Sequence, residues 1–331
     1  MPLIRMQFLQ QESALRELED KMSRLSLKSV APFIGLFIFA FILLSVGLDS
    51  IVSAALQANA LMLLFSLAFI PFIAIVQTVK WKLILDNQKQ KTSFVFLLKA
   101  YFVGLFYGAI TPGKLGSFYR ISLLQKKTGK PLAFCTSSVL LDRILDLFSV
   151  LTFAFMGSVL LLEYFVDLYY SIFLIFVFLL SAFWFMLEKH RARTVLRHVF
   201  YVLVPEKLKE QSRDFFNKFY DSLPSKPVLL QAWFLSVVSW LLVFLQSYVI
   251  ALAFSINVPP LHVIGFVAIA SVISLIPITI NGLGTNEAAL ISLFALFSVS
   301  ASVVVAFSIV NALLLTYLTA LIGFMFSREE L

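Results

Sequence analysis

The chain has 331 residues, of which 60% are hydrophobic and 13% are charged, and its mean hydropathy is +0.96. Because about a quarter of the residues in a soluble domain are charged, this composition excludes that class and predicts an all-α polytopic membrane protein. Lys and Arg number 26 against 18 Asp and Glu, a net charge of +8. We interpret this surplus through the Lys- and Arg-rich cytoplasmic loops of membrane proteins, and not as a nucleic-acid surface.

Residues 1–29 form the first predicted element, a cytoplasmic amphipathic helix that lies on the membrane or pairs with a partner. Leu15, Leu18, Met22 and Leu25 recur there at heptad-like spacing among charged residues. Uncharged intervals then predict about six full transmembrane helices, because about 20 residues cover the hydrocarbon core. These predicted spans lie at 29–48, 60–79, 131–162, 168–187, 228–254 and 302–326. The second ends at the membrane surface with Trp81, and Lys80 and Lys82 beside it count among the cytoplasmic cations.

The distribution of cations predicts the orientation of the chain. No Lys or Arg occurs in the connections 49–59, 163–167 and 255–262, whereas the other connections are rich in both. With the cation-free connections outside, the N- and C-termini are cytoplasmic. We expect a multi-pass protein of the inner or plasma membrane.

A re-entrant hairpin near 94–130 is predicted inside the first membrane half, which covers residues 30–187. Only 14 uncharged residues separate Lys99 from Lys114, and both flanking segments are rich in Lys. As a helix these residues would reach about 21 Å, which is too short to cross the membrane and return. The turn of the hairpin contains Pro112, Gly113 and Gly116.

Residues 188–227 are predicted to be a basic cytoplasmic segment at the membrane surface, and residues 228–327 the second membrane half. This half contains a broken segment at 262–300, whose turn sequence holds Pro277, Gly282 and Gly284. The segment is either a hairpin that enters from the outside or two full spans, and its short second arm favours the hairpin. Two broken segments in corresponding places indicate an inverted-repeat transporter.

Ionisable residues in apolar sequence are costly in lipid and are therefore the candidate functional residues. Asp142 and Asp146 are four residues apart on one helix face, where they repel each other unless a cation lies beside them. Arg143 and Arg120 are the candidates for that cation. The alternative is an ion-paired anchor that fixes the first hairpin to this helix.

Two further groups of residues are candidates for binding. Arg120 and Lys114, at a position where a helix begins, would form an anion site suited to a phosphate headgroup. Glu287 is the only charged residue between Lys226 and Arg328. It could accept hydrogen bonds from the NGLG turn, cap the following short helix, or bind a cation or a proton.

Three motifs in order carry a family resemblance over residues 30–326: TPGKLGSFYR (111–120), LDRILDL (141–147) and PITINGLGTNEAAL (277–290). With them the chain resembles the flippase-like integral-membrane region of lysylphosphatidylglycerol synthases and its stand-alone relatives. The resemblance implies a protein that moves a lipid or a lipid-linked headgroup between leaflets. It marks Arg120, Asp142, Arg143, Asp146, Asn281 and Glu287 as site residues. The soluble aminoacyl-transferring domain of bifunctional members is absent, so lipid aminoacylation is not predicted.

We therefore expect a lipid translocase whose substrate is an anionic phospholipid or a polyprenyl-phosphate-linked lipid. The chain has no Walker A motif, its three His are scattered, and its one cysteine, Cys135, allows no intramolecular disulfide. No catalytic residue, cofactor, metal or nucleic-acid partner is predicted. The alternatives are a lipid-modifying enzyme that uses the carboxylate pair as acid and base, and a non-transporting partner of a glycosyltransferase or lipid synthase. A homodimer is left open.

Overall fold

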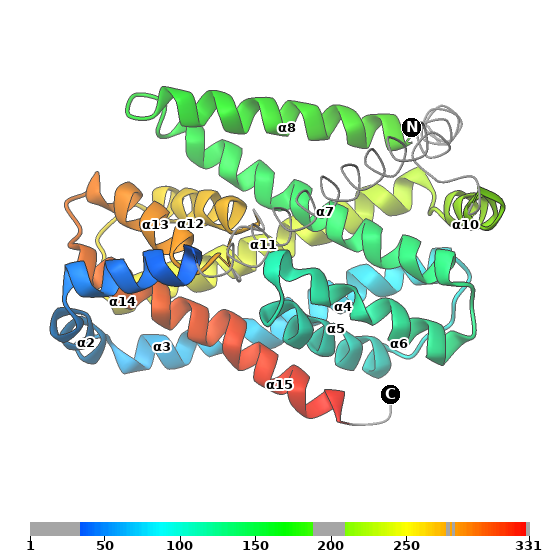
Figure 1. Cartoon of the computed structure of the whole chain (residues 1–331), viewed down its shortest axis with the longest axis horizontal. Helices are drawn as coiled ribbons and strands as arrows, with labels where there is room; N and C mark the ends of the chain where they lie inside the picture. The colour runs from blue at the N-terminus through cyan, green and yellow to red at the C-terminus, as the bar shows by residue number, and fades with distance from the viewer. Residues whose placement is uncertain (1–33, 188–208, 276–278, 280–281, 329–331) are drawn as a thin grey trace, which may run out of the picture.

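The computed structural model describes residues 34–187, 209–275, 279 and 282–328, and within these residues the regular structure is helical, without a strand. Figure 1 shows two groups of helices. One group contains α4 (Phe69–Asn87), α5 (Phe94–Ala109) and α6 (Tyr119–Thr128). The other contains α2 (Leu48–Leu56), α12 (Pro260–Ser274), α13 (Thr285–Ala295) and α14 (Ala301–Ala312). The 28-residue helices α7 (Leu132–Val159) and α11 (Lys226–Ala253) run through both groups.

Three helical stretches of the described residues are long and apolar enough to cross a membrane, namely Ala60–Asn87, Lys226–Ala253 and Ala301–Ser327. The first joins α3 (Ala60–Leu67) to α4, and the third joins α14 to α15 (Leu318–Ser327) through a short π-helix, Leu313–Tyr317. Shorter apolar helices include α5, α12 and Val166–Ser181 of α8 (Val166–Leu187). A multi-pass membrane protein follows from these helices, while the number of six spans stays a prediction.

The first predicted span, 29–48, is not one straight helix. The helix Ile34–Val46 ends at Gly47, and the chain turns by 81° into α2. Gly47 has a φ of 88°, a left-handed conformation that glycine adopts without steric cost. The predicted outer connection 49–59 therefore contains a helix, and the two helices together form either one broken span or a re-entrant segment.

The helix of the second predicted span extends beyond residue 79, where the span is predicted to end. The helix continues to Asn87, and both Lys80 and Trp81, expected at the membrane surface, have no exposed area. Lys80 is buried because carboxylates of α7 neutralise its charge, as described below.

The first hairpin consists of α5, the 3₁₀-helix η1 (Pro112–Phe118) and α6. Its two arms run antiparallel: each contact farther from the turn joins an earlier residue of α5 to a later residue of the other arm. Gly108 lies beside Ser117, Gly104 beside Arg120, and the ammonium group of Lys127 lies 5.5 Å from the ring centroid of Phe96. Two helices and a turn that contains Pro112, Gly113 and Gly116 thus occupy the segment 94–130, where a re-entrant hairpin is predicted. Its entry into the membrane from one side stays a prediction.

The second broken segment is also an antiparallel pair of helices, α12 and α13. Near the turn, Gly282 approaches Ser274, and far from it the rings of His262 and Phe297 lie 5.0 Å apart. Fifteen residues of α12 and 11 of α13 reach about 22 and 16 Å, both shorter than the hydrocarbon core. These lengths favour the hairpin over two full spans. Pro277 lies outside the described residues.

Each hairpin packs against a helix that follows the other hairpin. α7, which follows the first hairpin, packs along α12 of the second, and α15, which follows the second hairpin, packs along α5 of the first. A glycine on each following helix permits the close approach. Gly157 meets Gly265 of α12, where an added Cβ on Gly265 would lie 2.6 Å from the Cα of Gly157, and Gly323 meets the backbone of Phe102.

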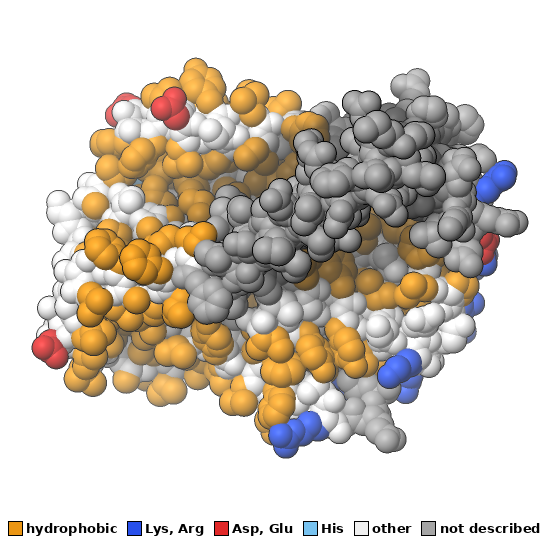
Figure 2. Space-filling view, in the orientation of Figure 1, with side chains coloured by type: hydrophobic (Ala, Val, Ile, Leu, Met, Phe, Trp, Pro, Cys, Tyr) orange, Lys and Arg blue, Asp and Glu red, His pale blue; other side chains and the backbone are white. Residues whose placement is uncertain are grey.

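Charged side chains lie at opposite ends of the face in Figure 2. Hydrophobic side chains cover much of the described surface. Lys and Arg lie at the right and the lower edge, whereas Asp and Glu lie at the left and also beside the cations at the right edge. Of the basic segment 188–227, the structure describes α10 (Lys209–Asp221), which ends beside α4 and α7. There Ser222 accepts a hydrogen bond from Gln88 at 2.9 Å and shares one with Ser137 at 2.7 Å. The predicted amphipathic helix at 1–29 lies outside the described residues.

Candidate functional site

The centre of the candidate site is Lys80 of α4, which lies between the two carboxylates of α7. Its Nζ is 2.9 Å from Oδ1 of Asp142 and 2.6 Å from Oδ1 of Asp146. One ammonium group therefore removes the repulsion that the four-residue spacing of the carboxylates would create. The sequence interpretation missed Lys80 because it counted this residue among the cytoplasmic loop cations.

A signal for Lys80 was nevertheless present in the sequence. Gln77 and Lys80 are three residues apart in an apolar run and so share one helix face. Both are buried, and both contact Asp146. Two polar residues on one face of a predicted span point to polar partners inside the protein.

Arg120 stands in the first turn of α6 and is enclosed by the protein. Its Nη2 donates to Oδ2 of Asp142 at 2.7 Å, and its guanidinium group lies 4.8 Å from the ring centroid of Trp81. The side chain crosses Gly104 of α5, where an added Cβ would lie 2.8 Å from its Cδ. At 1% exposure, Arg120 has the geometry of the anchor that fixes the first hairpin to α7.

Asp146 joins three helices through one of its two oxygens. Oδ1 accepts hydrogen bonds from Lys80 at 2.6 Å, from Gln77 at 3.2 Å and from Oγ of Ser236 on α11 at 2.6 Å. The only described contact of Oδ2 is with Nη1 of Arg143, at 3.8 Å. Oδ1 of Asp146 thus accepts from three donors, whereas Oδ2 has only a long contact.

Arg143 and Lys114 are the cations of the cluster that have no close partner among the described residues. The Nε and Nη2 atoms of Arg143 are buried and have no hydrogen-bond partner among the described residues. Lys114 lies at the hairpin turn with a φ of 57°, and the charges that act on it are those of Arg143 and Asp146. Because an unpaired buried donor costs about 1–3 kcal/mol, this side of the cluster is suited to an added acceptor such as an anion.

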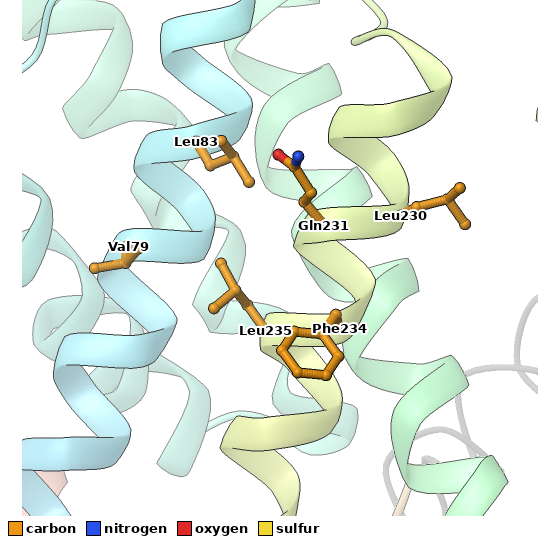
Figure 3. Close-up of a pocket in the computed structure, with 6 residues that line it drawn as sticks. All are labelled: Val79, Leu83, Leu230, Gln231, Phe234 and Leu235. Carbon is orange, nitrogen blue, oxygen red and sulfur yellow. The ribbon is translucent and has the colours of Figure 1, made fainter.

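An apolar groove of about 500 Å³ lies between α4 and α11. Figure 3 shows Leu83, Gln231 and Leu235 directed into the space between the two helices. Val79, Leu230 and Phe234 complete the lining. Val79 and Leu235 directly adjoin Lys80 and Ser236 in sequence, so the groove wall and the Asp146 contacts come from the same turns.

Glu287 belongs to a second polar cluster at the start of α13. Its Oε2 accepts a hydrogen bond from the backbone N–H of Gly284 at 2.6 Å, and its Oε1 accepts one from Ser308 at 2.9 Å. Asn286 also donates to Ser308, at 3.0 Å. These contacts correspond to two of the three roles considered for Glu287, the hydrogen bond from the NGLG turn and the cap of α13.

The structure therefore brings together Lys114, Arg120, Asp142, Arg143 and Asp146, and adds Lys80, Gln77 and Ser236. Within the described part of the chain, Glu287 forms no ion pair with that cluster. Gly282 and Gly284 occupy the turn before α13 with φ values of 79° and 83°. Asn281 lies outside the described residues.

Comparisons with known proteins agree with the motif resemblance. The model of the family "Lysylphosphatidylglycerol synthase TM region" matches residues 29–323. A UPF0104 membrane protein of Methanothermobacter thermautotrophicus is 23% identical, over 95% of either chain. A UPF0104 membrane protein of Methanocaldococcus jannaschii is 24% identical over 87% of this chain and 90% of its own, and one of Pyrococcus horikoshii is 22% identical over 88% and 93%.

Proposed function

The chain belongs to the family of the lysylphosphatidylglycerol synthase transmembrane region, and from that premise we propose that it is a lipid translocase. It binds the phosphate group of an anionic phospholipid or of a polyprenyl-phosphate-linked lipid and moves it between leaflets. The predicted orientation, with cytoplasmic termini in an inner or plasma membrane, is part of the proposal. The position of Lys and Arg at the right and the lower edge in Figure 2 supports that orientation.

The observation that carries the proposal is the guanidinium group of Arg143, whose one described ion pair is the 3.8 Å contact with Asp146. Two of its buried nitrogen atoms have no acceptor among the described residues, and Lys114 is the neighbouring cation. A guanidinium group binds phosphate through two parallel hydrogen bonds, and a lysine adds a point charge. We therefore assign phosphate binding to Arg143 and Lys114. The sequence had suggested Arg120 together with these two residues, but Arg120 is enclosed and paired with Asp142.

The arrangement of the hairpins supports movement of a substrate through the protein. Each hairpin packs against the helix that follows the other one. Such reciprocal packing is expected of an inverted repeat, in which rocking of one half against the other exposes a central site to alternate sides. The apolar groove between α4 and α11 is large enough to hold part of a lipid tail.

The carboxylate pair favours transport over acid–base chemistry. Asp142 is held by Lys80 and Arg120, and Asp146 by Lys80 and two neutral donors. Carboxylates fixed in this way act as counter-ions, whereas a general acid or base must exchange a proton with the substrate. Since the chain has no Walker A motif, transport is facilitated or driven by an ion gradient. A homodimer, or a glycosyltransferase or lipid-synthase partner, stays a prediction.

Reconstitution of the purified protein into proteoliposomes tests the proposal. The assay measures how fast fluorescent phospholipids on the inner leaflet become accessible to an external quencher. We expect the protein to accelerate this movement and Arg143→Gln to abolish most of the gain. Lys82→Gln, a change of a cation whose only described partner is Asp86 at the surface, is the matched control. No acceleration by the unmodified protein, or equal activity of the two variants, would refute the assignment.

A further inference from the structure

The charges of the first cluster do not cancel. Ion pairs join five charged side chains there: Lys80, Arg120, Arg143, Asp142 and Asp146. Lys114, at the turn of the first hairpin, is the sixth and lies near Arg143 and Asp146. Four are cations and two are carboxylates, which leaves a surplus of two positive charges. No third carboxylate forms an ion pair with this cluster within the described residues.

The surplus can be assigned to particular residues. Lys80 and Arg120 form close contacts of 2.6–2.9 Å with Asp142 and Asp146, so these four charges cancel as a group. Within the part of the chain that the structure describes, Arg143 reaches a carboxylate only at 3.8 Å, and Lys114 forms no ion pair. Uncompensated charges are costly in a partly buried site. A ligand that brought one negative charge would leave half of this surplus uncompensated.

We propose that the preferred ligand of this site is a lipid that ends in a phosphomonoester, because that group alone supplies two negative charges. This inference rests on the proposed function and names its substrate class. A phosphomonoester carries between about −1.5 and −2 charges at pH 7, since its second pKa is about 6. A phosphodiester headgroup such as phosphatidylglycerol carries only one. The three oxygens of a terminal phosphate also suffice for both free donors of Arg143 and for the ammonium group of Lys114.

Two lipids with identical acyl chains, phosphatidic acid and phosphatidylglycerol, provide the test. The full-length protein is equilibrated with an equimolar mixture of both, and the retained lipids are counted by native mass spectrometry. We expect phosphatidic acid to be retained at least about tenfold more than phosphatidylglycerol, because the second charge acts at short range in a medium of low effective dielectric constant. Equal retention would overturn the proposal.

Charge-removing variants connect the preference to the site. Arg143→Gln and Lys114→Gln each lower the surplus by one, and each is expected to bring the retention ratio close to one. Lys82→Gln removes one charge from the surface of α4 and is expected to leave the ratio unchanged. If Lys82→Gln lowered the ratio as much as the other two, the preference would come from general surface charge and the proposal would fail. Thermal unfolding of each variant shows that it is folded.

Two further measurements distinguish a site for free phosphate from a site for a lipid, and the preference for a dianion from lipid translocation itself. In the first, excess inorganic phosphate competes with bound phosphatidic acid. Displacement of the lipid shows a site for phosphate itself, whereas retention of the lipid shows that the tail is required. Both outcomes agree with a dianionic ligand. If proteoliposomes move both lipids equally and Arg143→Gln stops both, lipid translocation stands and the preference for a dianion is wrong. If neither lipid moves, the proposed function itself fails.

Discussion

Replacement of Lys80 by Met tests the interpretation of the central cluster most directly. Met has a similar length and no charge, so the change removes the ammonium group and leaves the packing largely intact. Both partner carboxylates stay behind in the interior, with 2% and 9% of their side-chain surface exposed. Removal of one partner of a buried ion pair costs about 3–5 kcal/mol. Because Lys80 serves two carboxylates, we expect its loss to lower the free energy of unfolding by about 4–5 kcal/mol.

The matched control is Lys82→Met, two residues further along the same helix. Lys82 is 35% exposed and pairs with Asp86 at 2.8 Å in an i,i+4 arrangement, for which about 0.3–0.5 kcal/mol is typical. Both variants are purified in detergent and unfolded by increasing fractions of SDS in mixed micelles.

The double variant Lys80→Met/Asp146→Asn removes one charge of each sign and should recover about 2 kcal/mol of the free energy of unfolding, because the unpaired carboxylate is gone.

Two results would refute this reasoning. If Lys80→Met and Lys82→Met lowered the free energy of unfolding within about 1 kcal/mol of each other, the buried ion pairs would not stabilise the fold. If the double variant were less stable than Lys80→Met, the loss would come from packing and not from an uncompensated charge.

Three further changes separate structural from functional residues. Arg143→Gln should stop most lipid movement in proteoliposomes yet change the free energy of unfolding by less than about 1 kcal/mol, because its ion pair is loose. Arg120→Gln should instead lower the free energy of unfolding by about 3 kcal/mol or more. Equal losses of stability would contradict the two roles. Gly265→Ala should lower stability by about 1–3 kcal/mol in thermal unfolding, since its Cβ would overlap the facing helix, while Gly108→Ala, with 3.5 Å of room, should stay within about 0.5 kcal/mol. Glu287→Gln should cost about 1–2 kcal/mol through the weakened cap, with transport reduced only as the folded fraction falls; full stability with lost transport would assign Glu287 a direct role.

Much of the fold could be predicted because hydropathy and charge act along the chain. An uncharged interval of 14 residues between two Lys-rich segments is too short for two spans, so a hairpin was the remaining solution, and the structure has antiparallel arms there. The family was likewise evident from three motifs and agrees with the match over residues 29–323. The bend at Gly47 was not predicted, because a glycine in an apolar run has no local mark of the conformation that it adopts.

The candidate site was only partly predictable. Its two aspartates stood out because carboxylates are rare in apolar helices, but their main partner did not. Lys80 lies 62 and 66 residues away from them in sequence. Charge counting placed it with Lys82 on the membrane surface, although the two side chains differ completely in burial.

The sequence by itself determined that this is a helical membrane protein with two interrupted segments and a few ionisable residues inside it, since these properties depend on local composition and length. Only the tertiary structure decided which charges cancel. Lys80 and Arg120 form close ion pairs with carboxylates, whereas among the described residues Arg143 has only a loose ion pair and Lys114 has none. The physical reason is that an ion pair forms over a few ångströms, and the rotation and packing of α4, α6 and α7 bring those particular atoms within that range.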